Sequence, residues 1–311
     1  MERIATSELR QADLARTLLI LSNYEWIQQQ AEAVGVSIVP LKGIDLLQTI
    51  YSERLDRPVR DIDLLCHTED DCRRLAEQLC LTDEYRLEFP FSLRPEALAA
   101  KHKVSLLSCS TTKVNVDIHT AFVTKKFFAQ TIGTFNADAL QRCHDGHMES
   151  TDRWLFLAQH AAFHLYADPK WVHDLQVLYE AFTPEQRNVL TGKALRYGFQ
   201  RVLTATQYHI AQHASSPTPQ SSFLRFIAHF NRPFSRRPFD RLVASYWEFV
   251  FIDRSSQRWR MWLQLMFPSR GMLTNIYRIR RPMALLLFYP LNILVAGLTS
   301  LLFWTIYLFK S

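Results

Sequence analysis

Glycine is scarce in this sequence, and none of its eight glycines belongs to a recognisable phosphate-binding loop. They stand at positions 35, 43, 133, 146, 192, 198, 271 and 297. No set of them has the Gly-x-Gly-x-x-Gly spacing of dinucleotide-binding loops or the Gly-x-x-x-x-Gly-Lys spacing of P-loops. The sequence therefore excludes Rossmann oxidoreductases and P-loop NTPases.

Cysteine pairs of the Cys-x-x-Cys type are also absent, although the chain contains five cysteines. An odd number of cysteines without such a pair predicts neither a zinc site nor a disulfide framework. The N-terminus, which begins Met1-Glu2-Arg3, lacks the features of a signal peptide. We therefore expect reduced thiols and a cytosolic compartment.

Charged residues are missing altogether from residues 283–309, a run of 27 positions rich in Leu, Ile, Phe and Val. A bilayer-spanning helix needs roughly 20 apolar residues. Three arginines within residues 278–281 precede the run and indicate that the body of the protein is cytoplasmic. Pro290 and Asn292 leave three arrangements open: a span, a helix in the membrane plane and a buried core helix. We predict a membrane-associating segment that holds the protein at the cytoplasmic face of the inner membrane, tail-anchored or peripheral.

The remaining composition is that of a folded protein with anionic partners. The chain has 311 residues, of which 48% are hydrophobic and 21% charged, enough for a substantial core and about two domains. Its net charge of +6 favours nucleotides, nucleic acid or acidic lipid headgroups as partners.

Two acids lie one residue apart in the apolar run at residues 57–65, Arg-Pro-Val-Arg-Asp-Ile-Asp-Leu-Leu. If this run is a strand, Asp61 and Asp63 point to the same face, because side chains alternate along a strand. Two like charges held so close repel each other unless a cation neutralises them or one takes up a proton. Paired carboxylate oxygens on a rigid strand suit Mg²⁺. The alternative is an exposed edge strand whose acids only face solvent.

Two other strand-like segments flank this pair in the sequence. Residues 39–44 form a short apolar strand that ends in Lys42-Gly43 and runs into a helical pattern. Residues 114–119 alternate, so that Asp117 and His119 share one face. A third carboxylate, Asp117, can then join the first two from a neighbouring strand.

Together, these segments resemble the polymerase-β-like nucleotidyltransferase superfamily, and more narrowly the bacterial family of uncharacterised nucleotidyltransferases. The matching motifs are Leu41-Lys42-Gly43, Arg57-Pro58 before Asp61-Ile62-Asp63-Leu64-Leu65, and Val116-Asp117-Ile118-His119. Two residues depart from the wider pattern: Ile44 follows Gly43 where that superfamily has Gly or Ser, and Arg60 precedes the first acid where a small residue is expected.

The resemblance implies transfer of a nucleoside monophosphate from an NTP to an acceptor, with release of pyrophosphate. It implies that Asp61, Asp63 and Asp117 are the catalytic residues and bind two Mg²⁺ ions, for which Mn²⁺ can substitute. Two such ions stabilise both the attacking and the leaving oxygen.

The resemblance also assigns four residues to the nucleotide. Lys42 and the amide of Gly43 would hold phosphate oxygens. Arg57 would contact the triphosphate or order the loop before the acids. His119 would position the acceptor or hold Asp117, with a hydrogen-bonded strand histidine as the alternative.

The predicted fold is α+β, with a small mixed β-sheet flanked by helices, a helical second domain and a C-terminal hydrophobic helix. We place the nucleotidyltransferase domain at residues 1–148, the helical domain at 149–275 and the hydrophobic segment at 283–309. Helices are expected over residues 7–34 and 69–80, and again from a cap at Thr151 or Asp152.

Two features of the second half admit several interpretations. His160 and His164 share a helix face and precede His173-Asp174, which permits a metal site or a helical phosphohydrolase, but core packing is favoured. Residues 225–241 interleave arginine with phenylalanine. Such a segment can contact nucleic acid or a membrane surface, or can form a solvated basic face.

The acceptor is not identified by the sequence; a saccharide, a lipid-linked intermediate, an RNA end and a protein side chain all remain open. The basic charge leaves nucleic acid open as a partner, but we favour an envelope saccharide or lipid-linked acceptor. The rival hypothesis is a catalytically inactive nucleotide-binding or membrane-tethered module of the same fold.

Overall fold

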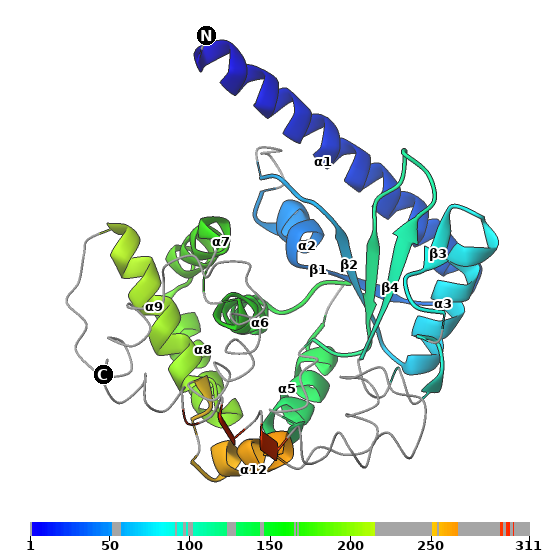
Figure 1. Cartoon of the computed structure of the whole chain (residues 1–311). Helices are drawn as coiled ribbons and strands as arrows, with labels where there is room; N and C mark the ends of the chain where they lie inside the picture. Colours follow the sequence, from blue (N-terminus) through cyan, green and yellow to red (C-terminus); the bar gives the residue numbers. More distant parts are fainter. Residues whose placement is uncertain are drawn as a thin grey trace. The chain divides into compact units, whose positions relative to one another are not determined.

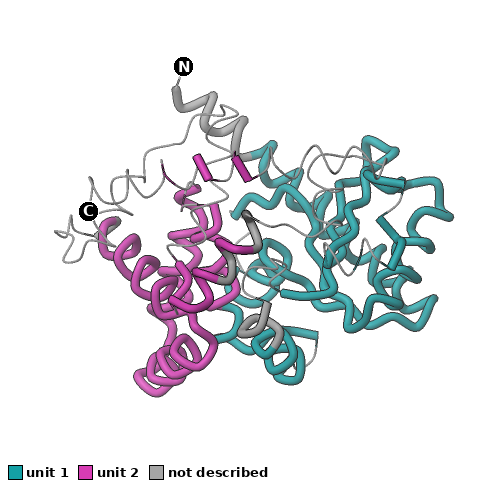
Figure 2. The backbone as a smooth tube through the Cα atoms, turned by 60° about the horizontal axis from the view of Figure 1, so that its bottom comes forward, with its two compact units in different colours: residues 1–153 teal, residues 154–311 magenta. Residues whose placement is uncertain are grey.

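The chain forms two compact units in a computed structural model, residues 1–153 and residues 154–311 (Figure 2). The structure describes residues 2–51, 57–90, 92–95, 98, 102–122, 129–143, 146–164, 166, 168–214, 251–253 and 255–266, and five isolated positions between 293 and 301.

The first unit is built on a five-stranded mixed sheet with the strand order β1-β2-β5-β4-β3 (Figure 1). The strands are β1 (Ile38–Leu41), β2 (Ile62–Cys66), β3 (Tyr85–Leu87), β4 (Lys103–Ser108) and β5 (Val116–His119). β2 and β5 are parallel, and the other neighbours are antiparallel. The expectation of an α+β protein with a small mixed sheet is confirmed.

Four helices of the first unit are described: α1 (Glu2–Ala33), α2 (Lys42–Thr49), α3 (Glu69–Leu81) and α5 (Ala129–Gln141). α3 begins where the sequence predicted, because the side chain of Thr68 accepts a hydrogen bond from the backbone N–H of Asp71. α1 packs beside α3, with hydrogen bonds from Arg74 to Val34 O at 2.9 Å and from Gln78 to Gln30 at 2.9 Å.

α3 covers one face of the sheet. Cys66 at the end of β2 lies next to Cys72 of α3, and burial together with this neighbouring thiol raises the pKa of Cys66. Because side chains alternate along a strand, Asp63 points to the face opposite to that of Cys66. The acid therefore lies on the face of the sheet opposite α3.

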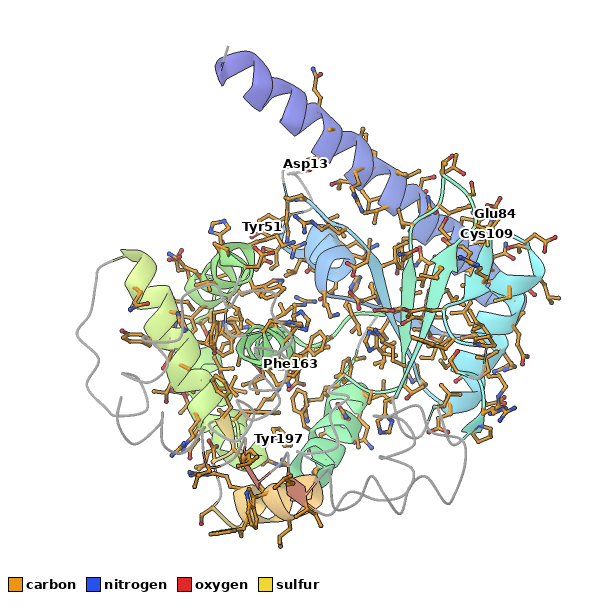
Figure 3. The ribbon with its side chains drawn as sticks, in the orientation of Figure 1. Asp13, Tyr51, Glu84, Cys109, Phe163 and Tyr197 are labelled. Atoms are coloured by element: carbon orange, nitrogen blue, oxygen red, sulfur yellow. The ribbon has the colours of Figure 1, made fainter. Side chains whose placement is uncertain are left out.

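The ends of β3 and β4 are joined by backbone pairing beyond the strands. Cys109 donates its N–H to the carbonyl of Glu84 at 2.9 Å, and the two residues lie side by side in Figure 3. Residues 109–115 connect β4 to its antiparallel neighbour β5, so the two strands form a hairpin.

β2 is shorter than the sequence indicated, and the prediction that one strand carries both Asp61 and Asp63 is wrong. The strand begins at Ile62, whose N–H donates to Asn115 O at 3.2 Å, immediately before its partner β5 begins at Val116. Residues 57–61 lie outside the strand because the parallel partner does not extend past that point. Asp61 is therefore not part of the strand that carries Asp63.

The second unit is helical where it is described. Its helices are α6 (Ser150–Phe163), which begins in the first unit, α7 (Pro169–Glu180), α8 (Pro184–Tyr197), α9 (Gln200–Ala214) and α12 (Ser255–Met266). α6 starts one residue before the expected caps, since Glu149 accepts hydrogen bonds from the N–H groups of Thr151 and Asp152. Asp253 caps α9 by accepting from the N–H groups of Gln200 at 2.7 Å and Arg201 at 2.9 Å.

The predicted hydrophobic segment at 283–309 and the Arg/Phe segment at 225–241 lie outside the described residues, apart from five positions of the former. Within the described part of the chain, none of the helices has the length and apolar character needed to span a bilayer.

Candidate active site

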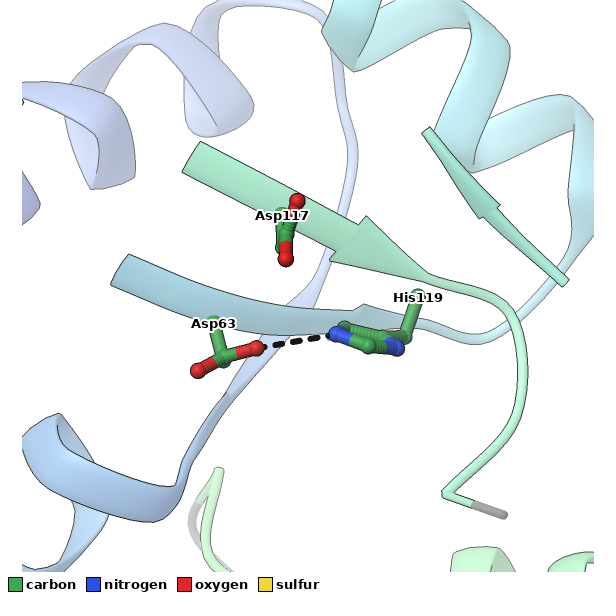
Figure 4. Close-up of side chains that lie close together, drawn as sticks. All are labelled: Asp63, Asp117 and His119. Carbon is green, nitrogen blue, oxygen red and sulfur yellow. Dashed lines mark hydrogen bonds and ion pairs between the residues drawn. The ribbon is translucent and has the colours of Figure 1, made fainter. Parts of the chain in front are cut away.

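The face of the sheet opposite α3 carries a row of polar side chains on three neighbouring strands. In the strand register, Asp63 of β2 stands beside Asp117 of β5, and Asp117 stands beside Ser105 of β4. Two residues further along β5, His119 is paired with Lys103 of β4. Figure 4 shows Asp63, Asp117 and His119 gathered on the two adjacent strands.

Asp63 is the most deeply buried acid of this row, with only 3% of it exposed. Its Oδ1 accepts a hydrogen bond from Lys42 Nζ at 2.6 Å and lies 3.0 Å from His119 Nε2. Burial alone would raise the pKa of the Asp63 carboxyl, but the Lys42 ammonium and the His119 hydrogen bond outweigh it and hold the pKa well below its usual range. Asp63 is therefore ionised at physiological pH.

Asp117 has a separate set of partners on β4. Its Oδ2 accepts from Lys103 Nζ at 2.7 Å, and its Oδ1 accepts from the Ser105 hydroxyl at 2.6 Å. Both partners follow from the antiparallel register, because Ser105 is directly opposite Asp117 and Lys103 lies two residues further along the same face. Each acid of the pair thus has its own lysine.

The turn from β1 into α2 brings Lys42 to Asp63. Leu41 is paired with Asp63 across the sheet, so the residue after it begins α2 beside the acid. Lys42 has a φ of 51°, a left-handed conformation that costs a residue with a side chain about 1–2 kcal/mol. A strained backbone at a point where a charged group meets a carboxylate is typical of a functional site.

Gly43 is required at the next position by close packing. A Cβ on Gly43 would lie 2.7 Å from Cγ1 of Val59 and 3.3 Å from a guanidinium nitrogen of Arg57. Val59 is 3% exposed and Arg57 is 7% exposed, so neither side chain has much room to move. The loop before β2 therefore packs directly against this turn.

We expect Gly43→Ala to lower the free energy of unfolding by about 1–3 kcal/mol, because the added methyl group overpacks the contact with Val59. Urea denaturation measures it. Gly192→Ala is the matched control, since a Cβ there meets nothing within 4 Å and Gly192 is exposed inside α8. That variant should gain about 0.5–1 kcal/mol. Equal stability of the two variants would contradict the packing argument.

The donor set fits a divalent cation. One ligand atom each of Asp63, Asp117 and His119 lie within 4.8 Å of one another. The described partners of Asp63 both engage Oδ1, which leaves its Oδ2 available as a ligand. Carboxylate oxygens suit Mg²⁺, while an added imidazole also suits transition metals such as Mn²⁺.

The structure brings together five of the seven residues predicted for the site: Lys42, Gly43, Asp63, Asp117 and His119. Arg57 adjoins this group through Gly43. Asp61 precedes β2, is exposed and does not belong to the group of three ligand atoms. The sequence did not predict Lys103 and Ser105 as site residues. Pairing residues 103–108 with residues 116–119 as a hairpin would have indicated that both lie near Asp117.

The histidines of α6 form a different kind of cluster. The rings of His160 and His164 lie 4.7 Å apart, and each packs within 5.2 Å of the Trp171 ring on α7. They are not part of any three-ligand metal group in the described part of the chain. His160 is only partly buried and His164 is exposed, so this is packing between α6 and α7 and not burial in the core.

A family model described as an uncharacterised nucleotidyltransferase matches residues 5–214, more than half of the chain. Searches of curated proteins and of solved structures found no significant match. The matched range includes the β1–α2 turn, both paired acids and their lysines, and it confirms the resemblance noted in the sequence. The chain belongs to the family of uncharacterised nucleotidyltransferases.

Proposed function

We propose that this protein transfers a nucleoside monophosphate from an NTP to an acceptor hydroxyl and releases pyrophosphate, with divalent metal bound at Asp61, Asp63 and Asp117. The observation that carries the proposal is the register that places Asp63 beside Asp117. Lys42, at the turn that contains Gly43, forms an ion pair with Asp63. Family membership supports nucleotidyl transfer in general.

The chain's own residues have distinct roles in this proposal. Asp63 and Asp117 supply the oxygens that hold metal, and Asp61 supplies a further carboxylate from the segment before β2. Bound metal would neutralise charge on the phosphates and lower the pKa of the attacking hydroxyl. Lys42 and the backbone amide of Gly43 bind phosphate oxygens.

Arg57 and His119 support this arrangement. Arg57 is buried beside Gly43, where its guanidinium stabilises the turn or reaches the triphosphate. His119 Nε2 lies at hydrogen-bond distance from Asp63 Oδ1, so it fixes the orientation of that carboxylate and leaves Oδ2 for a cation.

The test is a transfer assay on the full chain. Each of the four α-³²P-labelled ribonucleoside triphosphates is incubated with the protein, Mg²⁺ or Mn²⁺ and fractionated cell extract. The expected result is metal-dependent release of pyrophosphate and transfer of label into one fraction, lipid-extractable, polysaccharide or acid-precipitable. Metal-dependent nucleotide binding without transfer to any fraction would favour the inactive binding module, and absence of binding would contradict the proposal.

We also propose that the protein works at the cytoplasmic face of a membrane, which would place a saccharide or lipid-linked acceptor within its reach. After Asp253 the chain contains no acidic residue, but it has seven arginines and one lysine. On α12, Trp259 and Leu263 are four residues apart, on one helix face, and both are exposed. An apolar face next to arginines is typical of helices that lie at an anionic lipid surface.

Full-length protein is expected to sediment with membranes and to resist a carbonate wash, because the 27-residue uncharged run buries a large apolar surface in lipid. A chain that ends at Arg281 should become extractable and should keep nucleotide binding. Full-length protein that stays in solution without detergent would contradict the membrane proposal. The proposal of nucleotidyl transfer does not depend on that result.

A further inference from the structure

The two central acids of the site are each neutralised by a lysine from a different element. Lys42, after β1, lies 2.6 Å from Asp63, and Lys103, at the start of β4, lies 2.7 Å from Asp117. The proposed function assigns Lys42 to the phosphates. It gives no role to Lys103, whose ammonium takes one of the two oxygens that Asp117 offers to a metal.

The charges of these four side chains cancel. The other two charged residues predicted for the site, the exposed Asp61 and the buried Arg57, also carry opposite charges. A divalent cation is attracted by a surplus of negative charge, and these side chains provide none while both lysines stay in place. A triphosphate brings several negative charges, so the paired groups favour entry of metal and nucleotide together over entry of metal alone.

The Lys103–Asp117 ion pair is easier to separate than the Lys42–Asp63 ion pair. Its side chain is 37% exposed and that of Asp117 is 25% exposed, whereas the side chains of Lys42 and Asp63 are 21% and 3% exposed. Separating the Lys103–Asp117 pair leaves both charges in contact with water, at low cost. Separating Lys42 from Asp63 would leave a buried charge with less compensation, at high cost.

We propose that Lys103 couples metal binding to nucleotide binding. In the free protein it occupies Oδ2 of Asp117 and opposes the binding of metal alone. When a metal–nucleotide complex arrives, Lys103 leaves Asp117 and its ammonium pairs with phosphate oxygens. This inference rests on the proposed function, because it requires that an NTP binds at these acids.

The test compares the affinity for Mn²⁺ alone with the affinity for the Mn²⁺ complexes of the four α,β-methylene ribonucleoside triphosphates, by calorimetry on the full chain. Lys103→Met should bind free Mn²⁺ about tenfold more tightly than the unaltered chain, because Asp117 loses a competing cation. The same variant should bind the nucleotide complex several-fold more weakly, by about threefold or more. Lys103→Arg keeps the charge and should restore most of the original coupling.

Lys113→Met is the matched control. Lys113 lies on the connection between β4 and β5 with its Nζ 3.9 Å over the Trp26 ring, and it is not paired with an acid of the site. This control removes the same charge from the same hairpin and should leave the affinity for free Mn²⁺ unchanged. Melting temperatures verify that both variants are folded.

Gain of affinity for free Mn²⁺ in Lys103→Met but not in Lys113→Met supports the role of Lys103, since a purely structural lysine would not oppose metal. Unchanged or weakened Mn²⁺ binding in Lys103→Met, or an equal gain in both variants, overturns it while the proposed function stands. If the unaltered chain binds no metal–nucleotide complex, the proposed function fails and this inference fails with it.

Discussion

Asp63→Asn is expected to lower the rate of nucleotidyl transfer by about a hundredfold to a thousandfold, the loss found when one charge-stabilising group is removed from an active site. Asp63 is the buried acid on which Lys42 and His119 converge, and its second oxygen is available to a cation. The amide keeps the shape of the side chain but lacks the charge that holds metal. The measurement is turnover of the labelled NTP at saturating Mg²⁺.

Asp61→Asn and Asp70→Asn calibrate this effect. Asp61 lies before β2 and outside the group formed by Asp63, Asp117 and His119, so we expect a smaller loss of nucleotide–metal affinity, about tenfold. Asp70 is an exposed acid on α3 that pairs with Arg73 and Arg74, and its replacement should leave turnover unchanged. An Asp63→Asn protein with full turnover would remove the central assignment.

The second large effect concerns stability. Asp45 of α2 is 2% exposed and forms a bidentate pair with Arg153, with Nε to Oδ2 at 2.6 Å and Nη2 to Oδ1 at 3.1 Å. The same Arg153 nitrogen donates to Met148 O at 3.1 Å, and His147 Nδ1 lies 3.4 Å from Asp45 Oδ1. This pair ties the helix that follows the Lys42–Gly43 turn to the start of α6.

Arg153→Met should lower the free energy of unfolding by about 3–5 kcal/mol, because it leaves the Asp45 carboxylate buried without its main partner. Urea denaturation followed by circular dichroism measures the change. The double variant Asp45→Leu/Arg153→Met removes both charges and should recover much of the loss.

Arg74→Met is the control for this prediction. Arg74 also pairs with two acids, Asp70 and Asp71, but its side chain is 44% exposed, so its replacement should cost less than about 1 kcal/mol. If Arg153→Met costs no more than Arg74→Met, the Asp45 pair is not a buried anchor.

The sequence alone determined most of the local structure of the first unit. An apolar run that ends in Lys42-Gly43 predicted a strand and a turn into a helix, and β1 and α2 occupy that position. The helix expected over residues 69–80 is α3, which begins at Glu69. These signals are local, since they depend on side-chain periodicity and on capping within a few residues.

The family motifs also identified Asp63 and Asp117 as candidate partners, and the structure places them side by side in the parallel register of β2 and β5. That register was not readable from the chain, because the two strands are separated by α3 and two further strands. The register also determines that β2 begins at Ile62, so Asp63 lies in the strand and Asp61 does not.

Only the tertiary structure decided which cations neutralise the acids. Lys103 and Ser105 reach Asp117 because β4 pairs with β5 in one register, and a shift of one residue would turn both to the other face. Arg153 reaches Asp45 across 108 residues of sequence. Such pairings depend on contacts between distant segments, whereas periodicity and capping report only on near neighbours. The sequence therefore identified Asp63 and Asp117 as candidate site residues, and the tertiary structure determined which basic side chains pair with them.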